Sequence, residues 1–361
     1  MISEKHEGHT ISRKSICAIL VLSILLGICS CGKEEEPIET YDTSNYLTVG
    51  FSQLGAESDW RVANTESIKS SLTRQNGIEL MFDDAQQKQD RQILAIRNFI
   101  QQEVDYIVLA PVTETGWDTV LTEAKDAEIP VIIVDRMVDV EDTNLYTAWV
   151  GSDFKREGDI ACEWLKHFTD AKGIAPGEVN IVDIQGTLGA TAQIGRTRGL
   201  EEAVSKYGWN LLASVPADYT QAKAKEVMQD LLAEHQNINV VYCENDNEAI
   251  GAIEAIEAAG LKVGTDMAAG EILIISFDAA NSGLTKVLEG KIALDVECNP
   301  LQGEPVKNLI KAVDSGEEYQ KYTYIEEMAF SIDDTVKSVT IKDEVYDITF
   351  LTQEILNKRE Y

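Results

Sequence analysis

The chain has 361 residues, 44% of them hydrophobic, and its 62 acidic against 31 basic residues give a formal net charge of −31. Such a surface repels phosphate backbones, and the sequence has no Lys/Arg cluster with interleaved aromatic residues, so nucleic acid is excluded as a partner. Once a leader and a tether are set aside, about 315 residues remain, which suffices for two domains of ordinary size.

The first 30 residues have the layout of a secretory signal peptide. Lys5, Arg13 and Lys14 precede an apolar run over residues 16–29, which matches the basic and apolar regions of such leaders. The run is about 14 residues long, short of the roughly 20 that a helix needs to cross a bilayer. We therefore expect a cleaved leader rather than a permanent membrane span.

The end of the leader resembles a bacterial lipobox, because small Ser30 stands directly before Cys31. We predict lipidation at Cys31. Cys29 follows bulky Ile28 and is the poorer acceptor, and a signal peptide with an incidental cysteine is the alternative. Residues 31–45 are polar and acidic and are expected to form a flexible tether. The lipid would anchor the protein to a membrane in the periplasm, or at the cell surface if the acidic stretch after Cys31 acts as an export tag.

From Tyr46 onward, short β-branched runs alternate with helical patterns. The first series of expected strands covers residues 47–53, 78–84, 106–112, 130–135 and 148–153, with helices over 60–73, 88–102 and 117–127. A second series covers residues 178–185, 210–217, 239–246, 272–279 and 291–298. Continuous apolar runs suit strands buried on both faces. Two such βαβ series predict an α/β fold with two doubly wound parallel-sheet lobes.

Reactive residue types are scarce in these two series. Cys162, Cys243 and Cys298 are widely spaced and show no disulfide framework or metal spacing, so they are expected to be small buried side chains. Cys298 remains a candidate for intermolecular pairing. His167 and His235 fall in expected helices without a second ligand at helical spacing. Neither a Ser-His-Asp hydrolase nor a histidine-ligated metal enzyme is expected, and we predict no cofactor and no metal.

Ligands of open α/β sheets bind beyond the carboxyl ends of the strands, and this chain places unusual polar residues there. They are Ser52 and Gln53 after the first strand, Asp135 and Arg136 after the fourth, and Asn245, Asp246, Asp278 and Glu297 in the second series. Taken singly, each suits a cap or a loop equally well. Two sheets that face each other across a cleft would bring these ends together, and this coincidence indicates a binding site.

One candidate group follows the first strand, where Glu57, Trp60 and Arg61 would project from a helix entrance capped by Ser58 or Asp59. An aromatic face beside a carboxylate and a guanidinium is how proteins hold sugars, since the C–H face of the sugar stacks on the ring and its hydroxyls bond to the charged groups. The alternative places Trp60 in the core and pairs Arg61 with Glu57 on the surface.

Two further candidates lie in the second series. Arg196 stands in the glycine-rich stretch 186–199, which could cradle a phosphate at a helix start but matches neither G-x-G-x-x-G nor a P-loop. Tyr219 lies between a strand and a helix and would supply a second aromatic face, although a core or capping role suits it equally.

Six stretches form ordered motifs: GFSQLGAESDWR (50–61), DAQQKQDRQ (84–92), APVTETGWDTVLTEAKDAEIPVIIVDR (110–136), QGTLGATAQIGRTRG (185–199), KEVMQ (225–229) and ENDNEAIGAIEAIEAAGLK (244–262). Together they resemble the ribose/galactose type of periplasmic sugar-binding protein, the substrate-binding component of an ABC importer, and most of all its galactofuranose-binding members. By position, the resemblance assigns ligand binding to Glu57, Trp60, Arg61, Asp135, Arg136, Arg196, Tyr219, Asn245 and Asp278.

The resemblance departs toward the end of the chain. Asp278 is followed by alanine where relatives usually have glycine, and the last polar contact is expected from Glu297 or Asn299. Beyond Lys321 the similarity thins. These departures concern the exact sugar more than the sugar class, so galactofuranose or a related pentose or hexose is the expected ligand.

The resemblance also implies two lobes joined by a three-strand hinge, so that neither lobe is contiguous in sequence. The N-terminal lobe is expected to comprise residues 46–150 plus 299–325, and the C-terminal lobe residues 151–298 plus 326–361. The lobes would close around a monosaccharide, and the permease would sense that closure. Such a protein is expected to act as a monomer.

Three other functions compete with this one. A transcription regulator with the same core would need an N-terminal helix-turn-helix and a basic face. A glycosidase could use Glu57 and Asp278 as its carboxylate pair, but arginines beside both acids would keep them ionised, which disfavours a general acid, so no enzyme is expected. A sensor that passes its sugar-loaded form to a membrane kinase fits the sequence as well as an importer subunit does.

Overall fold

The computed structural model describes residues 46–361. The predicted signal peptide (1–30), the lipid acceptor Cys31 and the tether (31–45) lie outside the described residues. Within residues 46–361, no helix combines the length and the apolar character that a membrane crossing requires.

The ten strands that the sequence predicts are all present as β1 to β10, and four more follow. The strands are β1 (Leu47–Gln53), β2 (Ile78–Asp84), β3 (Tyr106–Leu109), β4 (Val131–Val134), β5 (Ala148–Gly151), β6 (Asn180–Gln185), β7 (Asn210–Pro216), β8 (Val240–Cys243), β9 (Leu273–Asp278), β10 (Leu294–Glu297), β11 (Tyr322–Tyr324), β12 (Ala329–Ser331), β13 (Ser338–Ile341) and β14 (Glu344–Phe350).

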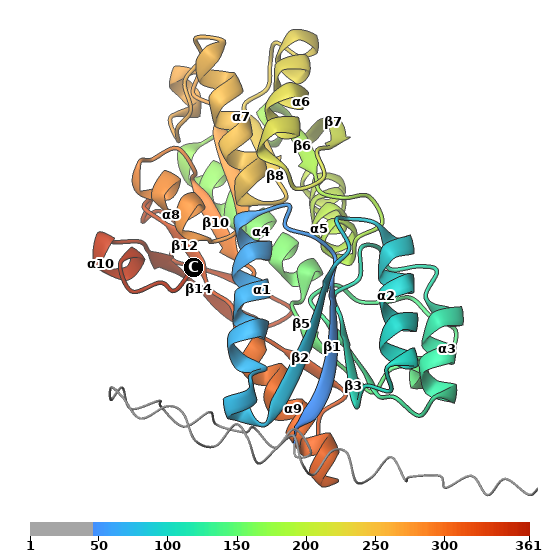
Figure 1. The fold of residues 1–361 in the computed structure, drawn as a ribbon. Coiled ribbons are helices and arrows are strands. Elements are labelled where there is room, and N and C mark those ends of the chain that lie inside the picture. The colour runs from blue at the N-terminus through green and yellow to red at the C-terminus, as the bar shows by residue number, and fades with distance from the viewer. Residues whose placement is uncertain (1–45) are drawn as a thin grey trace, which may run out of the picture. The chain divides into compact units, whose positions relative to one another are not determined.

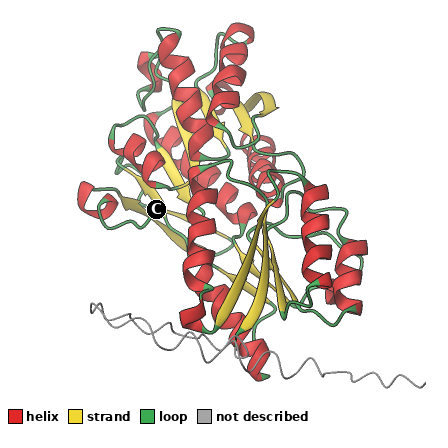
Figure 2. Ribbon diagram, viewed as in Figure 1, coloured by secondary structure: helices red, strands yellow, loops and turns green. Residues whose placement is uncertain are grey.

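Helices alternate with these strands along the chain (Figures 1 and 2). They are α1 (Asp59–Ser71), α2 (Gln89–Gln101), α3 (Asp118–Asp126), α4 (Phe154–Lys172), α5 (Thr191–Tyr207), α6 (Gln221–Glu234), α7 (Asp246–Ala258), α8 (Asn281–Leu288), α9 (Gly303–Ser315) and α10 (Gln353–Leu356).

The strands form two sheets, which confirms the predicted two-lobe α/β fold. The first sheet has the order β11-β5-β4-β3-β1-β2, and all its pairs are parallel. The second has the order β13-β14-β12-β10-β9-β8-β6-β7. In both sheets the order reverses beside the first strand of the series, and such a switch point is where doubly wound folds bind ligands.

The second sheet differs from the prediction at one edge. β12 runs antiparallel to β10, and β13 runs antiparallel to β14, so this sheet is mixed rather than purely parallel. β13 and β14 are joined by a short hairpin, and a hairpin can link only antiparallel strands. Residues 329–350 form this edge, and they belong to the stretch beyond Lys321 where the family similarity thins.

The chain passes three times between the sheets. The passages lie between Gly151 and Phe154, between Glu297 and Gly303, and between Tyr324 and Ala329. As a result, α9 and β11 return to the first sheet after most of the second has been traced (Figure 1).

Each sheet is covered by helices on both faces. On the first sheet, α1 and α9 pack on one face and α2 and α3 on the other. On the second, α4 and α5 cover one face, and α6, α7 and α8 cover the opposite one. The central strands β3, β4, β8 and β9 are buried along their whole length, as two-sided coverage requires.

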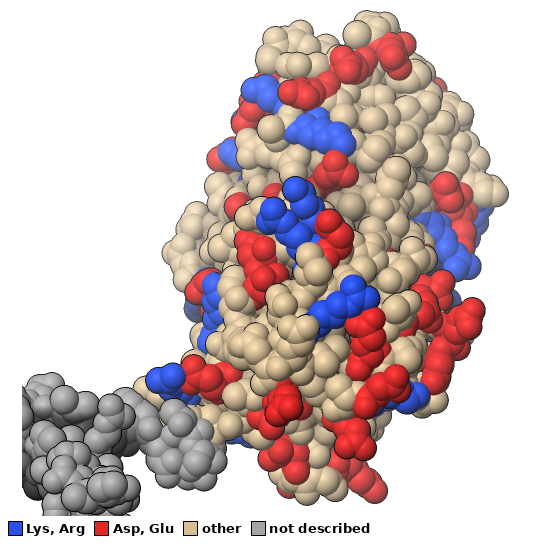
Figure 3. Space-filling model, turned by 45° about the vertical axis from the view of Figure 1, so that its right-hand side comes forward, with Lys and Arg blue, Asp and Glu red and all other residues tan. Residues whose placement is uncertain are grey.

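The surface is acidic. On the face drawn in Figure 3, Asp and Glu side chains are widespread and interleave with Lys and Arg, and that face shows no extended basic patch. This agrees with the net charge of −31.

Candidate functional site

A small cavity, largely filled by the side chains around it, lies between the two lobes, where the carboxyl ends of strands from both sheets meet. The lining residues are Glu57, Ser58, Trp60, Arg61, Asp135, Arg136, Phe154, Ala192, Arg196, Tyr219, Asn245, Asp278 and Cys298. Nine of the ten predicted ligand-binding residues are among them.

On the N-terminal lobe, four charged residues form one network. Arg61 donates through Nε to Glu57 Oε1 at 3.0 Å and through Nη2 to Asp135 Oδ2 at 2.6 Å. Arg136 Nη2 lies 3.6 Å from the same Glu57 oxygen, and its Nη1 donates to the Val112 carbonyl at 2.7 Å. The Arg61–Glu57 pair expected as an alternative does form, but it lines the cavity with side chains 2–3% exposed instead of lying on the surface.

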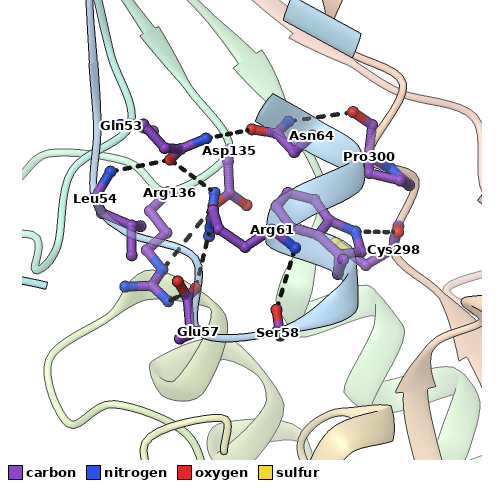
Figure 4. Close-up of polar contacts among 12 residues, drawn as sticks. Gln53, Leu54, Glu57, Ser58, Arg61, Asn64, Asp135, Arg136, Cys298 and Pro300 are labelled. Atoms are coloured by element: carbon purple, nitrogen blue, oxygen red, sulfur yellow. Dashed lines mark hydrogen bonds and ion pairs between the residues drawn. The ribbon is translucent and has the colours of Figure 1, made fainter. Parts of the chain in front are cut away.

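Arg61 is held by the start of α1 and by β1 (Figure 4). Ser58 Oγ accepts from the Arg61 amide at 3.2 Å, so Ser58 and not Asp59 is the helix cap. Gln53 Oε1 lies 3.5 Å from Arg61 Nη1. Burial alone would lower the pKa of the guanidinium, but Asp135 and Glu57 outweigh burial and raise it, so Arg61 stays charged.

The helix start is tied in turn to the second passage between the lobes. Asn64 Nδ2 donates to the Pro300 carbonyl and to Gln302 Oε1, both at 3.2 Å. Trp60 Nε1 donates to the Cys298 carbonyl (Figure 4). The first helix and the hinge therefore meet at the cavity wall.

On the C-terminal lobe, Arg196 occupies the centre of the wall. Its Nε donates to Glu157 Oε2 at 2.8 Å, its Nη2 lies 3.4 Å from Asp278 Oδ1, and its Nη1 donates to the Glu244 carbonyl. Burial raises the pKa of Asp278 well above its usual value, although Arg196 opposes the shift. The arginine that the sequence predicts beside Asp278 is thus in place, and burial of the carboxylate acts against it.

Three aromatic rings complete the lining. Trp60, Phe154 and Tyr219 pack with Ala192 and Cys298 in one apolar cluster and are each no more than 6% exposed. The Tyr219 ring fits because residue 186 is glycine: a Cβ there would lie 1.9 Å from the ring atom Cζ. Tyr219 therefore faces the cavity, as predicted.

Backbone strain concentrates at the same place. Asp135, Tyr219 and Asp278 have φ angles of 60°, 62° and 103°, a region that non-glycine residues seldom occupy. Such residues persist only where surrounding contacts hold them, and they cluster at ligand sites. For Tyr219 those contacts are its amide donating to Glu248 Oε1 at 2.8 Å and its carbonyl accepting from Asn245 Nδ2 at 3.2 Å.

Asn245 combines two roles. Its Oδ1 accepts from the Glu248 amide at 2.8 Å and so caps α7, while its Nδ2 holds the Tyr219 turn and lines the cavity. The sequence left open whether a strand-end residue was a cap or a ligand contact, and the cap role is present here.

Two buried atoms in the lining have no protein partner. Within residues 46–361, neither Glu57 Oε2 nor the Tyr219 hydroxyl makes a hydrogen bond. Unpaired buried polar atoms are costly and infrequent in native proteins. Both lie in a cavity wall, where ligand hydroxyl groups would satisfy them.

Glu297 departs from the prediction. Its Oε1 accepts from Arg359 Nη2 at 2.5 Å and from the Tyr361 hydroxyl, and its Oε2 accepts from the Met328 amide at 2.8 Å. The side chain is thus engaged by the C-terminal segment and does not line the cavity. The alternative, Asn299, bonds to the Glu326 carbonyl and does not line it either.

Four lining residues were not predicted: Ser58, Phe154, Ala192 and Cys298. Phe154 directly follows the expected strand 148–153, so the strand-end rule offered a signal for it. The sequence draws attention to the Cys298 thiol, whereas the Cys298 carbonyl is the group that accepts a hydrogen bond from Trp60.

One group of side chains has the composition of a metal site. Glu157, Cys298 and Glu327 place potential ligand atoms within 4.8 Å of one another. However, Glu157 is bonded to Arg196 at 2.8 Å, and Arg156 lies 3.9 Å from Glu327. Guanidinium groups thus already balance both carboxylates.

Contacts outside the cavity hold the two lobes together. The Asp59 amide donates to Asn247 Oδ1 at 3.1 Å, and Ser282 Oγ donates to Asp59 Oδ2 at 2.7 Å. Across the opposite rim, the Glu114 amide donates to the Gly189 carbonyl at 2.9 Å. These bonds link the first lobe to α7, α8 and the loop before α5, so the structure is a closed form.

Comparison with known proteins gives one consistent result. A family model described as a periplasmic binding protein domain matches residues 49–303. The galactofuranose-binding protein YtfQ of Escherichia coli K12 is 42% identical over 279 residues, which cover 76% of this chain and 82% of that protein.

Two solved structures agree with it. A Mycobacterium smegmatis protein in complex with β-D-fucofuranose is 45% identical, with a TM-score of 0.74 over 79% of this chain and 91% of that one. The periplasmic binding component of the arabinose ABC transporter of Shewanella sp. ANA-3, bound to α- and β-L-arabinofuranose, is 41% identical, with a TM-score of 0.72 over 78% of this chain and 91% of that one.

Proposed function

The chain belongs to the periplasmic binding protein family, and from this premise we propose that it captures a monosaccharide in the cavity between its lobes and delivers it to an ABC importer. It is a binding protein and not an enzyme, as its relatives are. The proposed ligand contacts are Glu57, Trp60, Arg61, Asp135, Arg136, Arg196, Tyr219, Asn245 and Asp278, with Phe154 added to the aromatic rings.

The observation that carries this proposal is the composition of the cavity wall. It contains three carboxylates and three guanidinium groups, so formal charges balance and a neutral ligand is favoured over an ion. Each guanidinium offers several fixed donors, and Glu57 Oε2 is a free acceptor. Rings stack on the C–H face of a sugar while donors and acceptors bind its hydroxyls.

A furanose is the ligand class that we favour. The relatives named above bind galactofuranose, β-D-fucofuranose and L-arabinofuranose, and all three ligands are five-membered rings. These ligands include a pentose and hexoses, yet all are furanoses, which indicates that the relatives select the ring form of the sugar.

Closure is the proposed mechanism of delivery. The N-terminal lobe is proposed to comprise residues 46–150 plus 299–325 and the C-terminal lobe residues 151–298 plus 326–361, so the three passages act as the hinge. A ligand that touches both walls stabilises the closed form over the open one. To move the ratio of closed to open protein from 1:99 to 99:1, the ligand must bind the closed form more tightly than the open form by about 5.5 kcal/mol. A few charge-assisted hydrogen bonds of about 1.5–3 kcal/mol each supply that free energy.

A thermal-shift screen tests the proposal. Aldopentoses and aldohexoses are added one at a time to the purified protein, because a ligand that binds only the folded state raises its melting temperature. Arabinose or galactose is expected to give the largest shift. The bound ring form is then identified from the carbon NMR signals of a ¹³C-labelled sugar. If no neutral sugar shifts the melting temperature, or if a glycoside is steadily hydrolysed, the proposal fails.

The membrane anchor is a separate proposal. The family places the protein in the periplasm, and we propose that a lipid on Cys31 tethers it to a membrane there, where it acts as a monomer beside the permease. Labelling cells with a radioactive fatty acid is expected to mark the protein, and Cys31→Ser is expected to abolish the label. Label retained by Cys31→Ser would contradict this assignment.

A further inference from the structure

The C-terminal residues lie against the β9 end of the cavity wall. After α10, the chain returns so that the Tyr361 carbonyl accepts from the Asn281 amide at 3.0 Å, at the start of α8. The Arg359 guanidinium lies over the rings of Phe330 and Tyr361, 5.2 and 4.4 Å from their centroids. Its side chain is only 12% exposed, so this segment is packed into the lobe.

Arg359 contacts the turn that carries a cavity residue. Its Nη2 donates to the Ala279 carbonyl at 3.1 Å and to Glu297 Oε1 at 2.5 Å. Ala279 directly follows Asp278, whose carboxylate lines the cavity and lies 3.4 Å from Arg196. One guanidinium thus joins the end of β9 to the end of β10.

The turn needs such support. Asp278 and Ala279 have φ angles of 103° and 52°, both unusual for residues with a side chain. On the amide side, Ala279 N donates to Asp295 Oδ1 at 3.1 Å. On the carbonyl side, Arg359 supplies the donor. A strained turn persists only when contacts on several sides determine it.

We propose that Arg359 is a positioning residue for ligand binding: it fixes the Asp278–Ala279 turn and thereby sets the Asp278 carboxylate against the bound molecule. This inference rests on the proposed function, since it assigns a role at the same site. It also explains Glu297, which takes part in binding indirectly, as the anchor for Arg359. The family model ends at residue 303, so Arg359 lies beyond the matched region, whereas Asp278, Ala279 and Glu297 lie within it.

The test compares Arg359→Met with a matched control on the same segment. Lys358 pairs with Glu354 on the surface, where their side chains are 72% and 79% exposed. Arg359→Met is expected to raise the Kd for the sugar found in the screen about tenfold, and Lys358→Met is expected to leave it unchanged. Both are measured by calorimetry on the full mature chain, with the melting temperature as a check of folding.

A double-mutant cycle separates positioning from general stabilisation. If Arg359 acts through Asp278, Arg359→Met should add less than a twofold loss of affinity in an Asp278→Asn background. Arg359→Lys keeps one donor and is expected to recover part of the affinity, and it replaces Arg359→Met if the latter does not fold.

Two results would overturn the inference: an unchanged Kd in Arg359→Met, or an equal loss of affinity with and without Asp278. A parent protein that binds no sugar would instead remove the proposed function, and the screen detects that failure before any variant is made.

Discussion

The two walls of the cavity hold their charges in different ways. On the N-terminal wall, two guanidinium groups face two carboxylates, Glu57 and Asp135, in one network. On the C-terminal wall, Arg196 faces Glu157 and Asp278, and other buried carboxylates lie behind it. Burial raises the pKa of Glu157 and Asp278 despite this arginine. Two guanidinium groups thus serve the first wall, whereas a single one serves the second.

Loss of Arg196 should have the largest effect. Arg196→Met would leave Glu157 and Asp278 buried without their cation, and breaking a buried pair in this way costs about 3–5 kcal/mol. The free energy of unfolding, measured with urea, should fall by that amount. Arg198→Met is the control on the same helix, because Arg198 is 70% exposed and its pair with Glu202 should contribute less than about 1 kcal/mol. Equal losses in both variants would show that Arg196 is not central to this wall.

The proton dependence of the second lobe can be tested at Asp183, which is fully buried in β6. Burial raises its pKa to about 7, against about 3.9 in an unfolded chain. Between those values the folded state holds the extra proton, so stability falls as pH rises from about 4 to 7 and then levels off. Asp183→Asn should remove this part of the slope, which is at most on the order of 4 kcal/mol.

Urea unfolding at several pH values measures that effect. The variant and the parent are expected to be similar at about pH 4, below both pKa values, and the variant is expected to be the more stable at pH 8. Part of the slope should remain in the variant, because burial also raises the pKa of Asp295 to about 7. Identical pH profiles would contradict the assignment.

On the first wall, substitutions should lower the affinity for the sugar. Arg61→Ala and Asp135→Ala are each expected to weaken sugar binding at least tenfold, because each removes a charged partner of the proposed ligand and of the network. Calorimetry gives the Kd, and Arg97→Ala, whose exposed pair with Glu123 lies on the same lobe, should bind as the parent does. Unchanged affinity in both wall variants would remove the proposed site.

The smallest effect concerns closure and not the walls. Asn247→Ala deletes the bond from the Asp59 amide across the rim, and one such bond contributes about 1 kcal/mol. The Kd should rise about fivefold without change in the melting temperature of the sugar-free protein. A loss as large as that of Arg61→Ala would mean that the rim, and not the cavity wall, dominates binding.

Most of the fold was predictable because its signals are local. The uninterrupted apolar runs of β3, β4 and β9 end in polar residues, and strands of this kind belong to doubly wound sheets. Because the carboxyl ends of these strands meet, Asp135 and Asp278 line the same cavity. The antiparallel edge formed by β12 to β14 was not predicted, since short alternating strands after residue 321 leave their pairing partners open.

The errors at the site have a different origin. Glu297 lies at a strand end as the other candidates do, but its carboxylate accepts a hydrogen bond from Arg359, which lies 62 residues further along the chain. Burial within the folded protein raises the pKa of Asp278. Neither fact is local, so neither could be predicted from the residues around these positions.

The late return of α9 to the first sheet has a consequence for how the molecule is made. Val306, Leu309 and Ile310 cover the same sheet face as Val49 and Phe51, yet a chain delivered from its N-terminus exposes them only after β6 to β10 have emerged. Until then α1 covers that side of the first sheet without α9. Contacts between residues so distant in sequence slow folding. A chaperone that shields this sheet face during secretion would therefore bind the first half of the chain.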